Sequence, residues 1–289
     1  MAIKKVVTII PTPPGHWVGD GFPVCTMFSY NERGKELSPF LLLDYAGPAE
    51  FQASNCPRGV GEHPHRGFET VTIVYQGEVE HRDSSGAGGK IGPGDVQWMT
   101  AASGVVHEEM HSRDFTRQGG TLEMVQLWVN LPAKFKMSTP RYQEIISSRI
   151  PTVVLPDAGG TLRVIAGLFK EMAGPAKTFT PINLFDLRLK KGHRLELDLP
   201  DGHTTALLAM KGKITVNSSK EIPSVRLVIL DQNGDRVAIE ALDDSTVLIM
   251  SGEPIHEPIA GYGPFVMNTQ EEIRRAREDY QNGRMGKIS

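Results

Sequence analysis

Residues 62–69, EHPHRGFE, decide how this chain folds, because two histidines two residues apart lead directly into a long strand-like segment. Side chains at positions i and i+2 of a strand point to the same face, so His63 and His65 face one way. A second pair with the same spacing, His107 and Glu109, follows the turn sequence of residues 92–95. Both pairs can therefore converge inside one β-barrel.

The sequence around these pairs has the pattern of β-strands separated by turns. Between Glu69 and Asp83, apolar and polar residues alternate, and Gly77 interrupts the alternation. We predict further strands at 6–10, 40–45 and 122–131. The glycine-rich loop 83–89 lies between two strand patterns and opens no helix, so we interpret it as a hairpin end and not as a phosphate-binding loop. These patterns predict an all-β protein.

Composition limits the classes of function. The 289 residues carry a formal net charge of −3, which gives no electrostatic surface for nucleic acid or for an anionic membrane. The sequence has no apolar run of transmembrane length and no apolar leader at its start. Cys25 and Cys56 are too few for a disulfide framework. We therefore expect a reduced, cytoplasmic protein.

The second half of the sequence repeats the first. Residues 70–77 (TVTIVYQG) resemble 205–212 (TALLAMKG), and the segment around His107 resembles the one around His256. Two copies of one β-domain explain these similarities. When the copies are aligned, the other three candidate ligand positions fall on Asp198, Pro200 and Pro258. We therefore expect the second copy to hold no metal.

A proline-bounded connection divides the two copies. We predict an N-terminal metal-binding domain at 1–134, a linker at 135–142 and a C-terminal metal-free domain at 143–289. Near the end, the segment 269–282 has the signals of a helix, with Thr269 as N-cap and Glu272 three residues later. The C-terminal domain should therefore end in a short helix.

The candidate chemistry lies in His63, His65, His107 and Glu109. Imidazole and carboxylate ligands suit Fe(II), Mn, Ni, Cu or Zn, and the softness of these ligands does not separate the metals. Four such ligands around a six-coordinate ion leave two positions open for substrate or dioxygen. Glu69 shares strand parity with His63 and His65, so it is an alternative fourth ligand or a hydrogen-bond acceptor behind the ligands.

Several neighbouring residues have two interpretations. Arg66 can orient a bound anion or form a structural ion pair, and His111 can face the cavity or lie exposed at a strand end. His81 shares the parity of His63 but lies beyond Gly77, so we assign it no role. Some large apolar residues can line a cavity or fill the core; these are Phe68, Trp98, Met99 and Met124.

Long segments of the sequence resemble the pirin family of the cupin superfamily. The matching strings are HPHRGFETV (63–71), PGDVQWMTA (93–101), HEEM (107–110), QLWVNL (126–131) and GPFVMNT (263–269). The resemblance implies a bicupin, two stacked antiparallel β-barrels of the jelly-roll type with a short C-terminal helix. It also implies one Fe(II) per chain, held by His63, His65, His107 and Glu109, with Ni, Mn, Cu or Zn as substitutes. In the general cupin pattern the carboxylate ligand lies at the position of Glu69. The resemblance implies that in this family Glu109 takes over that role.

Two classes of function follow from the resemblance. Members of the family are known as quercetin 2,3-dioxygenases, which open the central ring of a flavonol with O2 and release carbon monoxide. Other members are co-regulators that bind a transcriptional or metabolic partner protein and sense metal or redox state. We favour the iron-dependent dioxygenase, with Glu109 as both ligand and catalytic base for a flavonol-like substrate. We expect a monomer that makes no direct contact with nucleic acid.

Overall fold

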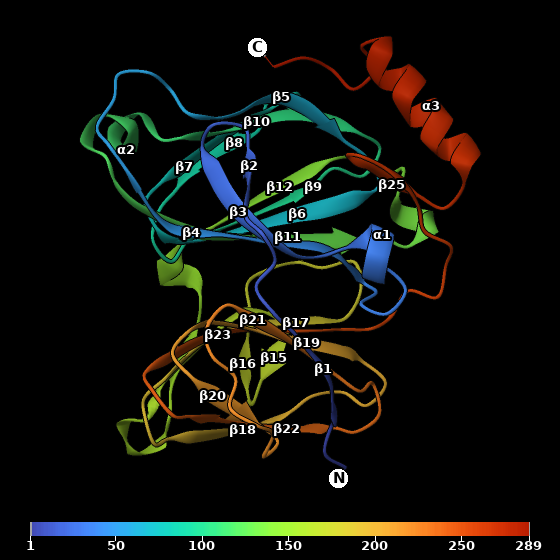
Figure 1. The fold of residues 1–289 in the computed structure, drawn as a ribbon. Coiled ribbons are helices and arrows are strands. Elements are labelled where there is room, and N and C mark those ends of the chain that lie inside the picture. The colour runs from blue at the N-terminus through green and yellow to red at the C-terminus, as the bar shows by residue number, and fades with distance from the viewer. Residues whose placement is uncertain (1, 289) are drawn as a thin grey trace. The chain divides into compact units, whose positions relative to one another are not determined.

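Two compact units make up the chain in this computed structural model, which describes residues 2–288 (Figure 1). The site unit contains Pro13–Lys35, Phe40–Ser147 and the described residues from Ile255 onward. The companion unit contains the described residues up to Thr12, together with Glu36–Pro39 and Ser148–Pro254. Both units combine separated segments, whereas the predicted domains 1–134 and 143–289 are continuous. Those domain boundaries stay a prediction.

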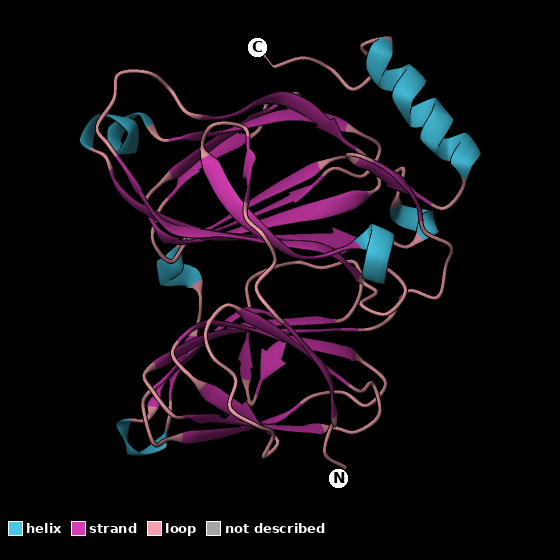
Figure 2. Cartoon of the chain, in the orientation of Figure 1, coloured by secondary structure: helices cyan, strands magenta, loops and turns pink. Residues whose placement is uncertain are grey.

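The site unit is built from two larger antiparallel sheets and a small one (Figures 1 and 2). The seven-stranded sheet contains, in spatial order, β12 (Arg141–Ile145), β9 (Val96–Thr100), β6 (Phe68–Gln76), β11 (Gly120–Asn130), β4 (Phe40–Phe51), β3 (Phe22–Ser29) and β2 (His16–Val18). The four-stranded sheet contains β5 (Gly59–His65), β10 (Val105–His111), β7 (Val79–Asp83) and β8 (Gly88–Ile91). The small sheet pairs β24 (Ala260–Tyr262) with β25 (Phe265–Met267), and the helices are α1 (Tyr30–Arg33), α2 (Arg113–Gln118) and α3 (Gln270–Gln281).

The companion unit repeats this plan with a seven-stranded and a three-stranded sheet. The larger sheet contains, in order, β1 (Val6–Ile10), β21 (Arg226–Leu230), β19 (Thr204–Lys211), β23 (Ser245–Gly252), β17 (Ile182–Leu189), β14 (Gly160–Ala166) and β13 (Thr152–Val154). The smaller sheet contains β18 (Arg194–Asp198), β22 (Arg236–Ala241) and β20 (Ile214–Val216), and β15 (Leu168–Phe169) pairs with β16 (Met172–Ala173). One buried aliphatic cluster, which includes Leu187, Leu197 and Val237, draws on both sheets and forms the core.

The predicted all-β class is confirmed, and the predicted strands coincide with observed ones. The strand expected at 6–10 is β1, and those expected at 40–45 and 122–131 fall largely within β4 and β11. Gly77, at φ +81°, separates β6 from β7, because a residue without a Cβ adopts this backbone conformation at little cost. Loop 83–89 connects β7 to β8 as a hairpin, as expected.

The C-terminal helix forms as its sequence predicts. The Thr269 side chain accepts a hydrogen bond from the Glu272 backbone, and the Glu272 side chain accepts one from the Thr269 backbone, which completes a capping box. Ile273 and Ala276 are buried in a cluster with Phe265 of β25. Such burial contributes most of the stability of a short helix. None of the helices in residues 2–288 is long and apolar enough to cross a bilayer.

Candidate metal centre

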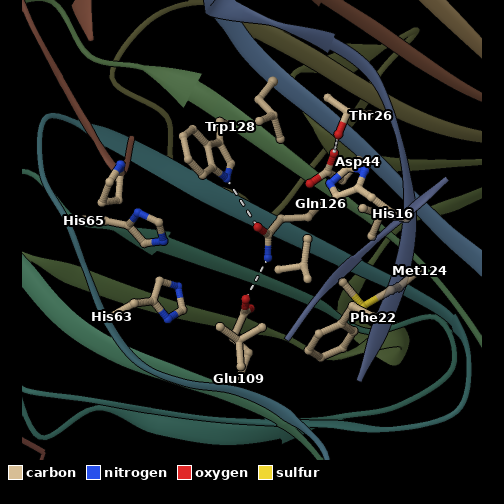
Figure 3. Close-up of a pocket in the computed structure, with 15 residues that line it drawn as sticks. His16, Phe22, Thr26, Asp44, His63, His65, Glu109, Met124, Gln126 and Trp128 are labelled. Atoms are coloured by element: carbon tan, nitrogen blue, oxygen red, sulfur yellow. Dashed lines mark hydrogen bonds between the residues drawn. The ribbon is translucent and has the colours of Figure 1, made fainter. Parts of the chain in front are cut away.

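Three imidazoles converge on neighbouring strands of the four-stranded sheet, and Figure 3 shows two of them, His63 and His65. His63 lies opposite His107 in the antiparallel pairing of β5 with β10, and His65 lies opposite Val105. The candidate ligand nitrogens of His63, His65 and His107 all lie within 4.8 Å of one another. His65 and His107 are buried, and His63 is half-buried. The structure therefore brings together three of the four predicted ligands as one group.

The hydrogen bonds around these imidazoles leave nitrogen lone pairs free for a metal. Nδ1 of His63 lies 2.8 Å from the carbonyl oxygen of Gly61, which can only accept, so Nδ1 carries the proton and Nε2 does not. Nε2 of His107 is buried without a hydrogen-bond partner. Burial lowers the pKa values of His65 and His107 well below the ordinary value, and the neighbouring imidazoles lower them further. Neutral, buried imidazoles with free lone pairs fit a divalent transition metal.

Glu109 lies beside the imidazoles and is fixed by amide and hydroxyl donors. Its Oε2 accepts a hydrogen bond of 2.7 Å from Nε2 of Gln126, and its Oε1 accepts longer ones from Thr72 (3.3 Å) and Gln97 (3.4 Å). These donors come from β11, β6 and β9, across the facing sheet. The candidate ligand atoms of Glu109, His107 and His81 form a second group, in which all three lie within 4.8 Å of one another. The complete four-ligand set of the prediction stays a prediction.

His81 is a member of the site that sequence reasoning missed. Its Nε2 lies 3.1 Å from Oδ2 of Asp83, and its Nδ1 lies 3.3 Å from Nδ1 of His107. Burial acts to raise the pKa of Asp83, but hydrogen bonds from His81 and Ser85 outweigh it and hold that pKa below its ordinary value. An ionised Asp83 accepts a hydrogen bond from Nε2–H of His81, which leaves Nδ1 of His81 as a hydrogen-bond acceptor. Asp83, His81 and His107 therefore form a continuous hydrogen-bonded chain that ends at the metal-facing ring.

A mostly apolar cavity of about 330 Å³ opens beside the imidazoles. Figure 3 shows Gln126 between the imidazoles and a second polar group formed by Asp44 and Thr26. Nε1 of Trp128 donates to Oε1 of Gln126 over 3.3 Å, which orients the amide that reaches Glu109. The lining residues are His16, Val18, Phe22, Val24, Thr26, Leu42, Asp44, Val60, His63, His65, Glu109, Met124, Gln126, Trp128 and Pro264. A small site of this kind suits a compact aromatic ligand.

Glu69, the alternative fourth ligand, points away from this cavity. Its carboxylate accepts a hydrogen bond of 2.7 Å from Thr100, and burial raises its pKa to about 7. Thr72, three residues later on β6, instead reaches Glu109. Gly67, at φ +91°, interrupts the backbone between His65 and Glu69. The shared parity therefore did not place these residues on one face.

Arg66 and His111, each with two interpretations from the sequence, both contact other residues of the site unit. Nη1 of Arg66 forms an ion pair with Asp279 of α3, at 2.8 Å. His111 was expected to face the cavity or to lie exposed at a strand end, and both expectations were wrong. It is 3% exposed, does not line the cavity and donates to the carbonyl of Gly21. Of the candidate cavity residues, Met124 lines the cavity, and Phe68 is buried behind it against His65 and Trp128. Trp98 and Met99 are buried and do not line the cavity.

Within residues 2–288, both groups of three candidate metal ligands lie in the site unit. In the companion unit, Asp198, which aligns with a ligand position, lies at the end of β18 and faces Arg236 across a 3.7 Å contact. Its side chain is 79% exposed, which is unlike the buried ligand positions of the site unit. Among the described residues, the candidate ligands therefore gather at one place, in the site unit.

Paired antiparallel sheets that gather three imidazoles and a carboxylate beside an apolar cavity define a cupin with a candidate metal centre. The family model for pirin matches residues 21–129, and the model for the pirin C-terminal cupin domain matches residues 184–286. The chain belongs to the pirin family.

Known relatives cover almost the whole chain. A Pseudomonas aeruginosa protein named "Putative quercetin 2,3-dioxygenase" is 58% identical over 282 residues, which are 98% of each chain. Human pirin is 38% identical over 259 residues, covering 87% of this chain and 84% of its own. The crystal structure of a quercetin 2,3-dioxygenase from Acinetobacter baumannii superimposes with a TM-score of 0.97 at 50% identity, and the match covers all of both chains.

Proposed function

We propose that this protein is a metal-dependent dioxygenase that opens the central ring of a flavonol with O2 and releases carbon monoxide. The observation that carries the proposal is the convergence of His63, His65 and His107 beside an apolar cavity of about 330 Å³. The names of the Pseudomonas and Acinetobacter relatives support the choice of reaction. We propose Fe(II) as the metal, one ion per chain in a cytoplasmic monomer, with Glu109 as the fourth ligand.

The metal, Glu109 and Gln126 would each have one task in this reaction. The bound metal would supply a Lewis acid that lowers the pKa of the flavonol 3-hydroxyl and gives dioxygen a redox partner. Glu109 would accept the proton of that hydroxyl, because its carboxylate lines the cavity and the imidazole lone pairs would be used to hold the metal. Gln126 would hold Glu109 through the 2.7 Å hydrogen bond.

The cavity walls would keep water from the reacting ring. Phe22, Met124 and Trp128 line the space beside the candidate ligands, and their side chains offer a planar ligand apolar contact. A site that excludes water protects a deprotonated flavonol from side reactions and strengthens the electrostatic interactions inside it. Both effects favour the ring-opening reaction over release of a partly oxidised substrate.

Oxygen uptake tests the proposal. Protein reconstituted anaerobically with Fe(II), and in parallel with Ni(II), is mixed with oxygenated buffer and a panel of flavonols while oxygen and carbon monoxide are measured. We expect one carbon monoxide released for each O2 consumed, and background rates for metal-free protein and for His107→Ala. No oxygen consumption by metal-loaded wild-type protein with any flavonol would contradict the proposal.

The same experiment separates the enzyme from the alternative function. A metal-sensing co-regulator would bind the metal with comparable affinity and would consume no oxygen. Its partner protein would bind the metal-loaded form with a different affinity from the metal-free form. The apolar cavity, with its carboxylate held among three donors beside the imidazoles, favours the enzyme.

A further inference from the structure

A second polar group lies across the cavity from the candidate metal ligands. Asp44, in the middle of β4, lines the cavity, and Thr26 of the adjacent strand β3 lies opposite it in register. Figure 3 shows these two residues, with His16 beside them, on the far side of Gln126 from the imidazoles. The mechanism described above leaves this group without a task.

Among the described residues, hydrogen-bond donors reach one carboxylate oxygen of Asp44 and not the other. Oγ1 of Thr26 donates to Oδ1 over 2.6 Å. Gln126, the neighbour of Asp44 on the other side, uses both ends of its amide elsewhere, donating to Glu109 and accepting from Trp128. Within residues 2–288, no donor forms a hydrogen bond with the second oxygen, Oδ2.

This arrangement leaves Asp44 able to accept a further hydrogen bond inside the cavity. Burial raises the pKa of the Asp44 carboxyl, and the hydrogen bond from Thr26 and the charge of His16 only partly oppose this effect. A carboxylate oxygen in a mostly apolar cavity is destabilised unless a donor reaches it. A ligand that fills the cavity and carries a hydroxyl at this end would supply that donor.

We propose that Asp44, oriented by Thr26, is a substrate-recognition subsite that accepts a hydrogen bond from a phenolic hydroxyl remote from the metal. The inference rests on the proposed function and specifies which flavonols the site selects. Selected substrates carry a neutral donor on the ring that points toward Asp44. Derivatives with a sulfate or carboxylate at that position are rejected, because two like charges would share a poorly hydrated space.

Ligand binding in the absence of oxygen tests the subsite separately from turnover. Metal-loaded protein is titrated anaerobically with a fully hydroxylated flavonol and with analogues that each lack one hydroxyl, on ring A or on ring B. Quenching of tryptophan fluorescence, to which Trp128 in the cavity wall contributes, and calorimetry report the dissociation constants. The proteins are wild type, Asp44→Leu, Asp44→Asn and Thr26→Val, with Val24→Ala, at an apolar cavity position on the strand of Thr26, as the control.

In the wild type, we expect removal of one particular hydroxyl to weaken binding about 10- to 100-fold, the range for hydrogen bonds to a charged group. The same removal should cost Asp44→Leu less than about threefold and should keep its full effect in Val24→Ala. Asp44→Asn, which keeps the shape and an acceptor oxygen, should show an intermediate effect and serves if Asp44→Leu does not fold.

The outcomes distinguish this inference from the proposed function. An equal loss in wild type and in both Asp44 variants would overturn the subsite, even if the wild type turns flavonols over. A hydroxyl effect that disappears only in Val24→Ala would also overturn it. If the hydroxyl effect depends on Asp44 but no oxygen is consumed, the result would support the subsite and contradict the dioxygenase. Wild-type protein that binds no flavonol would overturn both.

Discussion

Nδ1 of His81 lies 3.3 Å from Nδ1 of His107, so one of these two nitrogens carries the proton that they share. Asp83 sets which one by accepting a hydrogen bond from Nε2 of His81, and Gln97 favours the same arrangement, because its Nε2 lies 3.2 Å from Nδ1 of His81. That end of Gln97 is its NH2 group, since it also donates to Glu109 and its Oε1 accepts from Tyr142. Nδ1 of His81 therefore accepts, Nδ1 of His107 donates, and Nε2 of His107 keeps its lone pair for the metal.

Loss of the Asp83 carboxylate, which begins the hydrogen-bonded series to His81 and His107, should weaken metal binding. Asp83→Asn keeps the side-chain shape but no longer requires His81 to hold its proton on Nε2, so the His107 tautomer is no longer fixed. We expect a 10- to 100-fold loss of Ni(II) or Fe(II) affinity, about the range for changes behind a metal-binding histidine. Competition with a chelator measures it.

Asp95→Asn is the matched control, because Asp95 also accepts backbone hydrogen bonds in a turn, from Gly92 and Ser147. Its metal affinity should equal that of the wild type. Equal affinities for Asp83→Asn and wild type, or equal losses in the two variants, would show that the chain does not position His107.

Substitution of the proposed base should reduce turnover even when the metal is present. Glu109→Gln keeps an oxygen toward the cavity but cannot take a proton, and general-base catalysis contributes about 10²- to 10⁴-fold. We expect turnover per bound metal to fall by that order and its pH dependence to change. Oxygen consumption, normalised to metal content at each pH, provides the measurement.

Glu69→Gln is the control for this substitution, since it removes a buried carboxylate that faces Thr100 outside the cavity. Its turnover per metal should match the wild type. If Glu109→Gln keeps the wild-type rate and pH profile, Glu109 is not the base.

Metal stoichiometry should be one ion per chain. Both groups of candidate ligands share His107, and both lie in the site unit within the part of the chain described here. Elemental analysis after reconstitution with excess Fe(II) and desalting should approach one equivalent. It should fall to background in a His63→Ala, His107→Ala double variant, and two tightly held equivalents would contradict the single centre.

Glu69 should make stability depend on pH. Burial raises its pKa in the folded protein to about 7 from an ordinary value of 4.5, so the folded state binds more protons than the unfolded state between these values. Its contribution to stability is therefore fully present below pH 4.5 and is lost as pH rises through 7. The loss is at most about 3 kcal/mol, from 1.36 kcal/mol per pKa unit.

Glu69→Gln should remove this loss, and urea unfolding at pH 5 and pH 8 measures it. Relative to wild type, the variant should gain stability between the two pH values, whereas Glu32→Gln, at an exposed position, should not. A difference between Glu69→Gln and wild type that does not change with pH would mean that Glu69 is ionised in the folded protein throughout this range.

Local sequence patterns predicted the strands, the helix and the three imidazoles, because each depends on spacing along one segment. Residue parity gives the face of a strand but not its partner across the sheet. His81 was missed for this reason, since only the pairing of β7 with β10 places it opposite Glu109 and beside His107.

His111 and Glu69 show two further limits of sequence patterns. His111 is enclosed by aromatic rings from segments far away in the sequence, Phe22 at 5.6 Å and Phe51 at 4.6 Å between ring centroids. Glu69 changed face because the backbone turns at Gly67, and no pattern of polar and apolar residues records such a turn. Both positions depend on tertiary structure.

Isotope labelling tests the central claim most directly. Wild-type protein loaded with one equivalent of Fe(II) is given quercetin under ¹⁸O2, and the ring-opened product and the released gas are analysed by mass spectrometry. The account predicts a product that contains both ¹⁸O atoms, unlabelled carbon monoxide in equal amount, and neither compound from His107→Ala. A product with one ¹⁸O atom or none, or equal product from the metal-free protein, would contradict a metal-dependent dioxygenase.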